Sequence, residues 1–110
     1  MIRISANEMT GGRLLVYVAH FDITSDEISA KWGEGERFED EWDLGPRHIY
    51  CWRLAGGTYV SLNRVEIESV PGFSFNVRAD REDPDSMRAA LQSFLEESCI
   101  SEDRVVEMMF

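Results

Sequence analysis

The stretch from His48 to Arg78 constrains the fold most, because it reads as three β-strands in succession. Its strand-like runs are 48–54, 58–62 and 73–78. Gly56-Gly57 separates the first two runs, and Pro71-Gly72, a pair typical of a type II turn, precedes the third. In the third run apolar and polar residues alternate, as they do in a strand with one face on the core and the other in water. The sequence therefore predicts three consecutive antiparallel strands.

The apolar positions change parity within this stretch. Val60 and Leu62 are even-numbered, whereas Val65 and Ile67, after Asn63-Arg64, are odd-numbered. A shift of one residue turns every side chain to the other face of a sheet, and a bulge or a tight turn produces such a shift. We therefore expect a bulge or turn at Asn63-Arg64.

Two more strands are expected before this stretch and one after it. Residues 2–5 predict a short edge strand, which turns through Thr10-Gly11-Gly12 into a strand over residues 13–20. Apolar residues fall on both parities of this second strand, so we expect it to be covered on both faces and central, with a helix on at least one side. Residues 104–110 predict a final strand, with a short helix as the alternative.

Two helices are indicated by signals at their ends. The segment from Thr24 to Glu27 has the pattern of a capping box, and Gly33 supplies a C-terminal stop, so a helix is expected over Ser25–Trp32. A longer helix should run from Pro84 to about Ser98, with Asp83 at its N-cap. Its core-facing residues are Met87, Ala90, Leu91, Phe94 and Leu95.

Together these elements predict a single α+β domain over residues 1–110. It should contain an antiparallel sheet of five or six strands and two helices, the longer one, at about 84–98, packed on the sheet. A hydrophobic content of 44% suffices for a core and argues against disorder. Cys51 and Cys99 lack CxxC spacing and occupy apolar positions, so both are expected to be reduced core thiols.

The net charge of −10 restricts the partners of this chain. A charge of this sign repels nucleic acid and anionic membranes and favours a basic protein partner. The N-terminus lacks the apolar run of a signal peptide, and no stretch approaches the length of a membrane span. We expect a cytoplasmic protein that contacts neither membrane nor nucleic acid directly.

Most of this charge lies between Asp22 and Asp43. Nine acidic residues there stand against Lys31 and Arg37, which leaves a net charge of −7. The densest part, residues 34–43, lies between glycine-containing segments and is predicted to be a long connection between elements. Connections beyond about 12 residues without regular structure are often functional.

Aromatic residues accompany the acids. Phe38 and Trp42 are each surrounded by acidic residues, as interface hot spots are often ringed by polar groups, whereas Trp32 and Trp52 read as anchors on the sheet. We therefore predict a partner-binding segment. Its residues are Glu34, Glu36, Phe38, Glu39, Asp40, Glu41, Trp42 and Asp43.

Catalytic and metal-binding motifs are not found in the sequence. His20 and His48 are too few for a standard zinc site, and residues 22–26 open like a calcium loop whose required glycine and glutamate do not follow. Glu66 and Glu68 share a strand face, roughly 7 Å apart, and read as a solvated surface. We expect no enzymatic activity, no metal and no cofactor.

The sequence therefore favours a small cytoplasmic protein that binds and blocks a basic partner. In size, acidity and lack of a catalytic motif the chain resembles barstar-like immunity proteins, and this resemblance implies an inhibitor of a toxin, often a nuclease. A phage-type inhibitor that imitates nucleic acid is a second version. The alternatives are a structural or oligomer-forming subunit and a small carboxylate-dependent hydrolase. The identity of the partner and the oligomeric state are left open.

Overall fold

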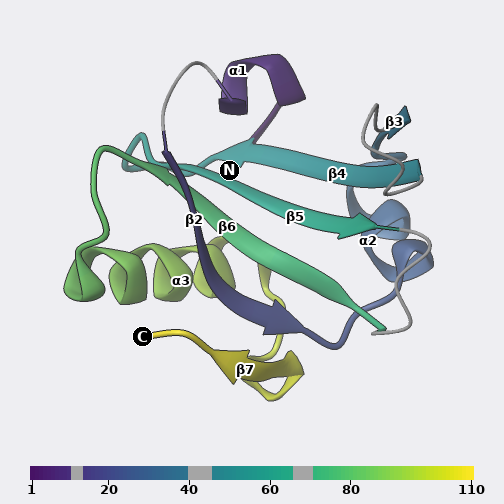
Figure 1. Cartoon of the computed structure of the whole chain (residues 1–110). Coiled ribbons are helices and arrows are strands. Elements are labelled where there is room, and N and C mark those ends of the chain that lie inside the picture. Colours follow the sequence, from purple (N-terminus) through teal and green to yellow (C-terminus); the bar gives the residue numbers. More distant parts are fainter. Residues whose placement is uncertain (11–13, 40–45, 66–70) are drawn as a thin grey trace.

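A computed structural model describes residues 1–10, 14–39, 46–65 and 71–110. Within these ranges the chain forms seven strands and three α-helices (Figure 1). In chain order they are β1 (Ile2–Ile4), α1 (Ala6–Thr10), β2 (Leu14–Phe21), α2 (Ser25–Trp32), β3 (Glu36–Glu39), β4 (Pro46–Arg53), β5 (Tyr59–Val65), β6 (Phe73–Ala79), α3 (Pro84–Ser98), the short 3₁₀ turn η1 (Glu102–Arg104) and β7 (Val105–Met108).

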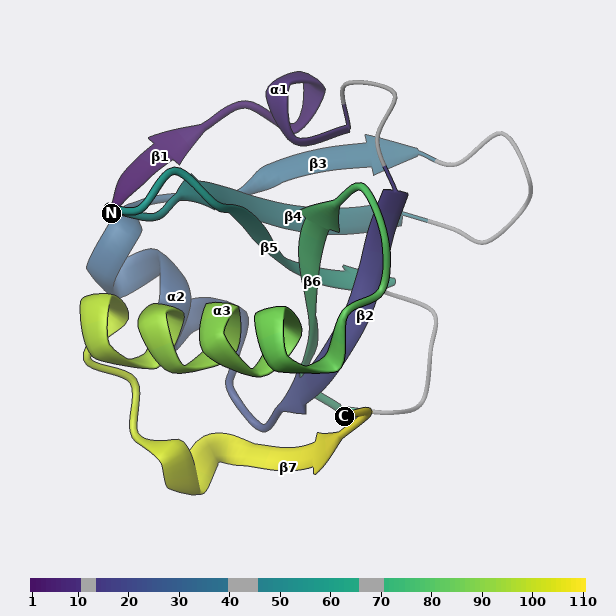
Figure 2. The same cartoon turned by 90° about the vertical axis from the view of Figure 1, so that its left-hand side faces the viewer.

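The strands form one antiparallel sheet with the order β1-β4-β5-β6-β2-β7, and β3 also pairs with β4. The long helix α3 lies across one face of this sheet (Figure 2). The predicted α+β fold, with the helix at 84–98 packed on an antiparallel sheet, is confirmed. The described part of the chain adds α1 and β3 to the elements expected from the sequence.

The meander β4-β5-β6 forms as predicted, but without a bulge at Asn63. The pairing of β5 with β4 runs from Tyr59 to Val65 without a shift in register, so that prediction is wrong. The pairing of β5 with β6 ends at Asn63, opposite Ser74. After that pair, the odd or even position of an apolar residue no longer shows whether its side chain faces the core. The change of parity in the sequence therefore did not indicate a bulge.

The predicted double cover of β2 is also wrong in its first half. Leu15 and Tyr17 are exposed, whereas Val18 and Ala19 are both fully buried although they are consecutive. The pairing of β2 with β6 shifts between Tyr17 and Ala19, so the strand bulges there. Apolar residues on both parities therefore reflect a bulge, which moves the inward-facing positions from one parity to the other.

Both predicted helices are confirmed with their caps. The Thr24 Oγ1 accepts the Glu27 amide hydrogen at 3.2 Å, and the Glu27 Oε1 accepts that of Thr24, also at 3.2 Å. Pro84 begins α3 after Asp83 at the N-cap, although the Asp83 carboxylate accepts from the Ser86 hydroxyl and not from a helix amide.

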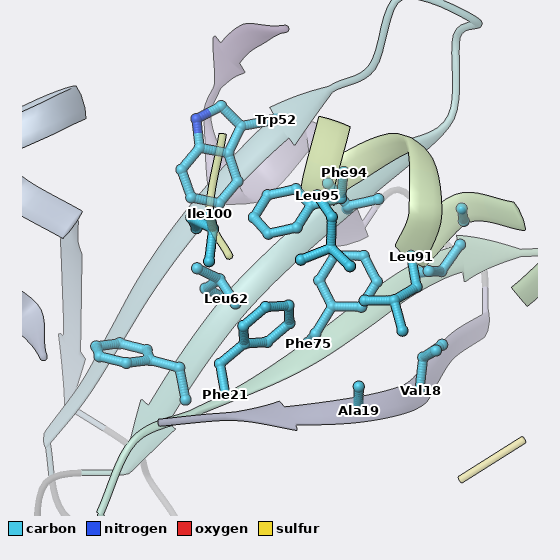
Figure 3. Packing of buried hydrophobic residues seen from close by; sticks show 14 of the residues in the cluster. Val18, Ala19, Phe21, Trp52, Leu62, Phe75, Leu91, Phe94, Leu95 and Ile100 are labelled. Atoms are coloured by element: carbon cyan, nitrogen blue, oxygen red, sulfur yellow. The ribbon is translucent and has the colours of Figure 1, made fainter. Parts of the chain in front are cut away.

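The main core lies between the sheet and the helices α2 and α3 (Figure 3). The Phe94 ring from α3 packs 4.8 Å from Phe75 and 5.8 Å from Phe21, measured between ring centroids. Trp52 is fully buried, and the edge-to-face contact with Trp32 has a centroid separation of 5.2 Å. Trp32 and Trp52 thus serve as the predicted anchors.

A second, smaller core lies on the opposite face of the sheet. Ala6 and Met9 of α1 cover Ile49 and Cys51 of β4 there. Cys51 is a buried free thiol, as expected, and burial raises its pKa to about 12. Cys99 is exposed, so the prediction of a core thiol is wrong at this position: α3 ends at Ser98, and Cys99 adopts a left-handed conformation (φ +60°) that turns the chain out of the helix.

None of the described helices is long and apolar enough to cross a membrane.

Candidate binding surface

The acid-rich segment contains a strand that the sequence did not indicate. Residues 36–39 form β3, which pairs antiparallel with residues 46–49 of β4, while β1 pairs with residues 51–53. The two short strands therefore lie end to end along one edge of β4 (Figure 2). The prediction of a long connection is corrected accordingly: β3 fixes the first half of the segment on the sheet.

The predicted binding residues have different environments. Glu34 is exposed and follows α2, whereas the Glu36 Oε2 accepts the Ala6 amide hydrogen at 2.6 Å and so helps to hold α1 on the sheet. Phe38 and Glu39 pair with Arg47 and Pro46 through β3, and their side chains lie outside the description. Asp40, Glu41, Trp42 and Asp43 fall outside the described residues. Glu39 and Pro46, the described residues on either side of these four, pair with each other.

A row of directly paired residues crosses the sheet from this edge to the other. Its members, from β3 to β7, are Glu36, Ile49, Asn63, Ser74, His20 and Glu107. Residues directly opposite each other in antiparallel strands point to the same face, so all six side chains share the face that carries α1. Five strand spacings of about 4.8 Å make the row roughly 24 Å long.

Helix α1 covers the first part of this face and leaves the second part open. A cavity of about 650 Å³ lies over the open part, between β5, β6, β2 and β7. It is lined by Tyr17, His20, Asp22, Asn63, Arg64, Pro71, Gly72, Ser74, Val106 and Glu107. We call this the row cavity, because four members of the row line it.

His20 has a fixed orientation in the row cavity. Its Nε2 lies 2.7 Å from the Pro71 carbonyl oxygen, and its Nδ1 lies 3.5 Å from the Tyr17 hydroxyl. A carbonyl can only accept a hydrogen bond, so Nε2 carries the hydrogen and Nδ1 of the neutral ring is an acceptor. A Cβ at Gly72 (φ +95°) would lie 3.0 Å from the His20 Nε2 and 2.1 Å from the Phe21 carbonyl oxygen. Glycine at 72 is therefore required for this arrangement.

Ser74 lies beside His20 in the row, but the two side chains are not joined by a hydrogen bond. The Ser74 hydroxyl donates to the Asn63 carbonyl oxygen at 3.0 Å and accepts from the Asn76 amide nitrogen at 3.2 Å. Nucleophilic catalysis needs the serine hydroxyl within hydrogen-bond reach of the histidine. Ser74 and His20 therefore do not form a serine–histidine pair of that kind in this structure.

Hydrogen-bond acceptors predominate around the row cavity. Among the described residues, the Asn63 Oδ1, an atom buried from solvent, has no hydrogen-bond partner. In the part of the chain that the structure describes, the exposed carboxylates of Asp22 and Glu107 form neither a hydrogen bond nor an ion pair. Arg64 is the cationic residue in the described lining, and its Nε is likewise buried without a partner.

Three hydrogen bonds from Arg104 position the rim of the cavity at Asp22. Arg104 donates from Nε to the Asp22 carbonyl oxygen at 2.7 Å, and its Nη1 and Nη2 each donate to a carboxylate oxygen of Glu27 at 2.8 Å. The Arg104 hydrogen bonds hold the pKa of Glu27 down, at about 2. These contacts fasten the start of β7, which carries Glu107, to the end of β2.

No group of three or more His, Cys, Asp and Glu side chains in the described ranges is placed to hold a metal ion. From the sequence alone, His20 is an isolated histidine in a strand. Its partners come from strands whose pairing is not visible in the sequence, and the alternation of polar residues in β6 was the one available signal.

No protein-family model matches this chain, and searches of curated proteins and of solved structures find no match either.

Proposed function

We propose that this chain is a small acidic cytoplasmic protein that binds and neutralises a basic protein partner. Its most specific form is an immunity protein, or a phage-type inhibitor, that blocks a nuclease-like active site. The observation that carries the proposal is the position of β3, which pairs residues 36–39 of the acid-rich segment 34–43 with residues 46–49 along an edge of the sheet.

Lys31, within the acidic region, and Arg3, from the neighbouring strand β1, both bind backbone carbonyl groups. The Lys31 Nζ donates to the Ser98 carbonyl oxygen at 2.7 Å and lies 5.2 Å from the centre of the Trp32 ring. Arg3, from β1, donates to the carbonyl oxygens of Trp32 and Glu34 at 2.9 and 3.2 Å. Both cations keep their positive charge in these contacts, so the net negative field of the region comes from its excess of acids, nine against Lys31 and Arg37.

The mechanism follows from this charge. Acidic side chains of the segment occupy a partner site that evolved to bind phosphate groups, and Phe38 or Trp42 fills a neighbouring apolar pocket. Opposite charges on the two proteins steer their encounter and raise the association rate.

Co-expression tests this proposal. The chain should restore growth to cells that express a basic nuclease toxin encoded by the neighbouring reading frame, and replacing Glu39, Asp40 and Glu41 with lysine should abolish the rescue. The matched control replaces Glu82, Glu96 and Glu102, three exposed acids outside the segment, with lysine. If only the control variant fails to rescue growth, or if both variants still rescue it, the assignment of the segment 34–43 is contradicted.

A second candidate function is self-association through β7. This strand pairs with β2 on one side only among the described strands, and Val106, Met108 and Met109 are 61%, 48% and 42% exposed. An edge strand with exposed apolar residues is a template for pairing with another chain. Sedimentation at micromolar concentration tests this candidate: a dimer that Val106→Lys dissociates would support it, and a monomer would reject it.

A further inference from the structure

We propose that α1 is a lid that opens while the rest of the sheet stays folded, and that this opening controls when the Cys51 thiol can react. Helix α1 lies on the opposite side of the sheet from α2 and α3 (Figure 1). It packs on β4 and β5, where Ala6 and Met9 cover Cys51. Cys51 is fully buried, so a reagent reaches its thiol only when this cover moves or the domain unfolds.

Helix α1 is held closed by a small contact area. It spans five residues, fewer than an isolated helix needs to be stable in water, so its contacts with the sheet keep it folded. Ala6 and Met9 are buried, whereas Asn7 and Glu8 are exposed. The main core lies on the other face of the sheet and contains no residue of α1. An opening of α1 therefore leaves the main core intact.

Two long-range hydrogen bonds latch α1 to the sheet. The Glu36 Oε2 accepts the Ala6 amide hydrogen at 2.6 Å, and the Arg78 Nη1 donates to the Glu8 carbonyl oxygen at 2.5 Å. Glu36 belongs to β3 and Arg78 to β6, so these bonds hold the helix from two sides. Each bond has one charged partner and so belongs to the stronger class of hydrogen bonds. Loss of either bond makes the opening of α1 easier.

A buried hydroxyl beside Cys51 opposes the closed state. Ser61 of β5 lies directly opposite Cys51 of β4, so both side chains point to the face that carries α1. Ser61 is 1% exposed, and its Oγ has no hydrogen-bond partner within the described chain. A hydroxyl buried without a partner costs free energy, which water recovers when α1 opens. The latch and this hydroxyl therefore act in opposite directions on the same equilibrium.

The closed state also suppresses the chemistry of Cys51. The thiolate is the reactive form of cysteine, and burial, together with the nearby charge of Glu36, raises the pKa of this thiol from its usual 9.0 to about 12. Opening returns the thiol to water and brings its pKa back towards the usual value. The open thiolate can then add to an electrophile such as a maleimide: its sulfur bonds to one carbon of the double bond, and the other carbon takes a proton from water.

Labelling of the wild-type protein by N-ethylmaleimide tests the lid, with mass spectrometry to separate the peptides that contain Cys51 and Cys99. Cys99 is exposed and serves as the reference for an open thiol. The labelling rate at Cys51 is measured at increasing urea concentrations below the unfolding transition. Opening of a short helix exposes little surface, so this rate should rise with urea by a small fraction of the slope for global unfolding. A rate that follows the full slope from zero urea would overturn the inference, because unfolding would then be what exposes Cys51.

Variants at Glu36 and Ser61 should change the Cys51 labelling rate in opposite directions. Glu36→Ala should raise it about tenfold, because the Ala6 amide loses a charged acceptor, and Glu36→Gln, which keeps a neutral acceptor, should lie between. Ser61→Ala should lower it about tenfold, because the closed state no longer buries an unpaired hydroxyl. The matched control is Glu34→Ala, at an exposed acid two residues before Glu36, which should leave the rate unchanged.

The urea slope and the order of the rates decide the outcome together. In Glu36→Ala the faster labelling should keep its weak dependence on urea, since α1 and not the whole domain opens. Should Glu36→Ala fail to fold, Glu36→Gln carries the same test with a smaller increase. Equal Cys51 rates in the Glu36 and Glu34 variants, or a rate that Ser61→Ala leaves unchanged or increases, would reject the lid as described.

Discussion

Glu27 and Arg104 lie 77 residues apart in the chain and form a two-pronged ion pair, with both nitrogen–oxygen distances at 2.8 Å. The same carboxylate also closes the capping box by accepting the Thr24 amide hydrogen. One side chain therefore fixes the start of α2 and fastens η1, at the start of β7, beside it. Both side chains remain partly exposed, at 42% and 36%, so water and salt weaken the pair.

This pair predicts a specific pH dependence of stability. The pKa of Glu27 is about 2 in the folded protein and 4.5 without these contacts, so the folded state binds the proton more weakly than the unfolded state. The stabilisation is complete above about pH 4.5 and is lost as the pH falls towards 2. Urea unfolding should show Glu27→Gln less stable than the wild type at pH 6, with the difference narrowing towards pH 2.5.

The control for this experiment is Asp26→Asn, which removes a neighbouring carboxyl group that has no ion pair in the described ranges. It should follow the wild type across the same pH range. A constant difference between Glu27→Gln and the wild type from pH 6 to 2.5 would show that ionisation of Glu27 does not contribute.

The capping box predicts non-additive mutations. Thr24→Ala should lower the free energy of unfolding by about 1 kcal/mol, because one helix amide loses its acceptor. Adding Glu27→Ala should cost less than the sum of the two single changes, since each residue caps the other. Denaturant unfolding of the four proteins measures the coupling, and strict additivity would show that the two caps act independently.

The aromatic core predicts a large effect at Phe75. This ring is fully buried against Phe21 and Phe94, so Phe75→Ala should destabilise the domain by about 3–5 kcal/mol. Leu15→Ala, at an exposed site on the neighbouring strand β2, should change stability by about 0.5 kcal/mol or less. A thermal midpoint of Phe75→Ala within error of the wild type would contradict the placement of β6 under α3.

Alanine substitutions at Gly72 and Gly57 distinguish the cost of steric crowding from the cost of backbone strain. Both have positive φ, +95° and +93°, but a Cβ at Gly57 meets nothing within 4 Å, whereas one at Gly72 would overlap the Phe21 carbonyl oxygen. Alanine at either position should cost about 1–2 kcal/mol from the left-handed backbone. Gly72→Ala should cost more and should also shift the NMR signals of the His20 ring. Equal destabilisation by the two substitutions would contradict the close packing around His20.

Local features of this chain could be predicted from the sequence, and long-range ones could not. The capping box at Thr24 depends on four consecutive residues, and the alternation in β6 depends on seven, so both were visible. The helix α1 has only five residues and no helical repeat to detect. The bulge near Val18 exists only in the pairing of β2 with β6, and the pattern of β2 alone was read as a strand covered on both faces.

The candidate site likewise has one part that could be predicted from the sequence and one part that could not. The acidic segment was found because charge is a property of composition, and the order of the residues shows where it is concentrated. The row cavity brings together Asn63, Ser74, His20 and Glu107 through three pairings between separate strands. Nothing in the sequence states those registers, since each depends on how the whole sheet assembles.

The most direct test of the account is the association rate with the basic toxin, measured by stopped-flow at about 0.05 and 0.5 M salt. The Debye length falls from roughly 14 Å to 4 Å over this range, so electrostatic steering weakens. If the acidic segment steers binding, wild-type association slows at least tenfold and the Glu39→Lys, Asp40→Lys, Glu41→Lys variant, although folded, no longer binds. Association that is insensitive to salt, together with undiminished binding by the variant, would contradict the account.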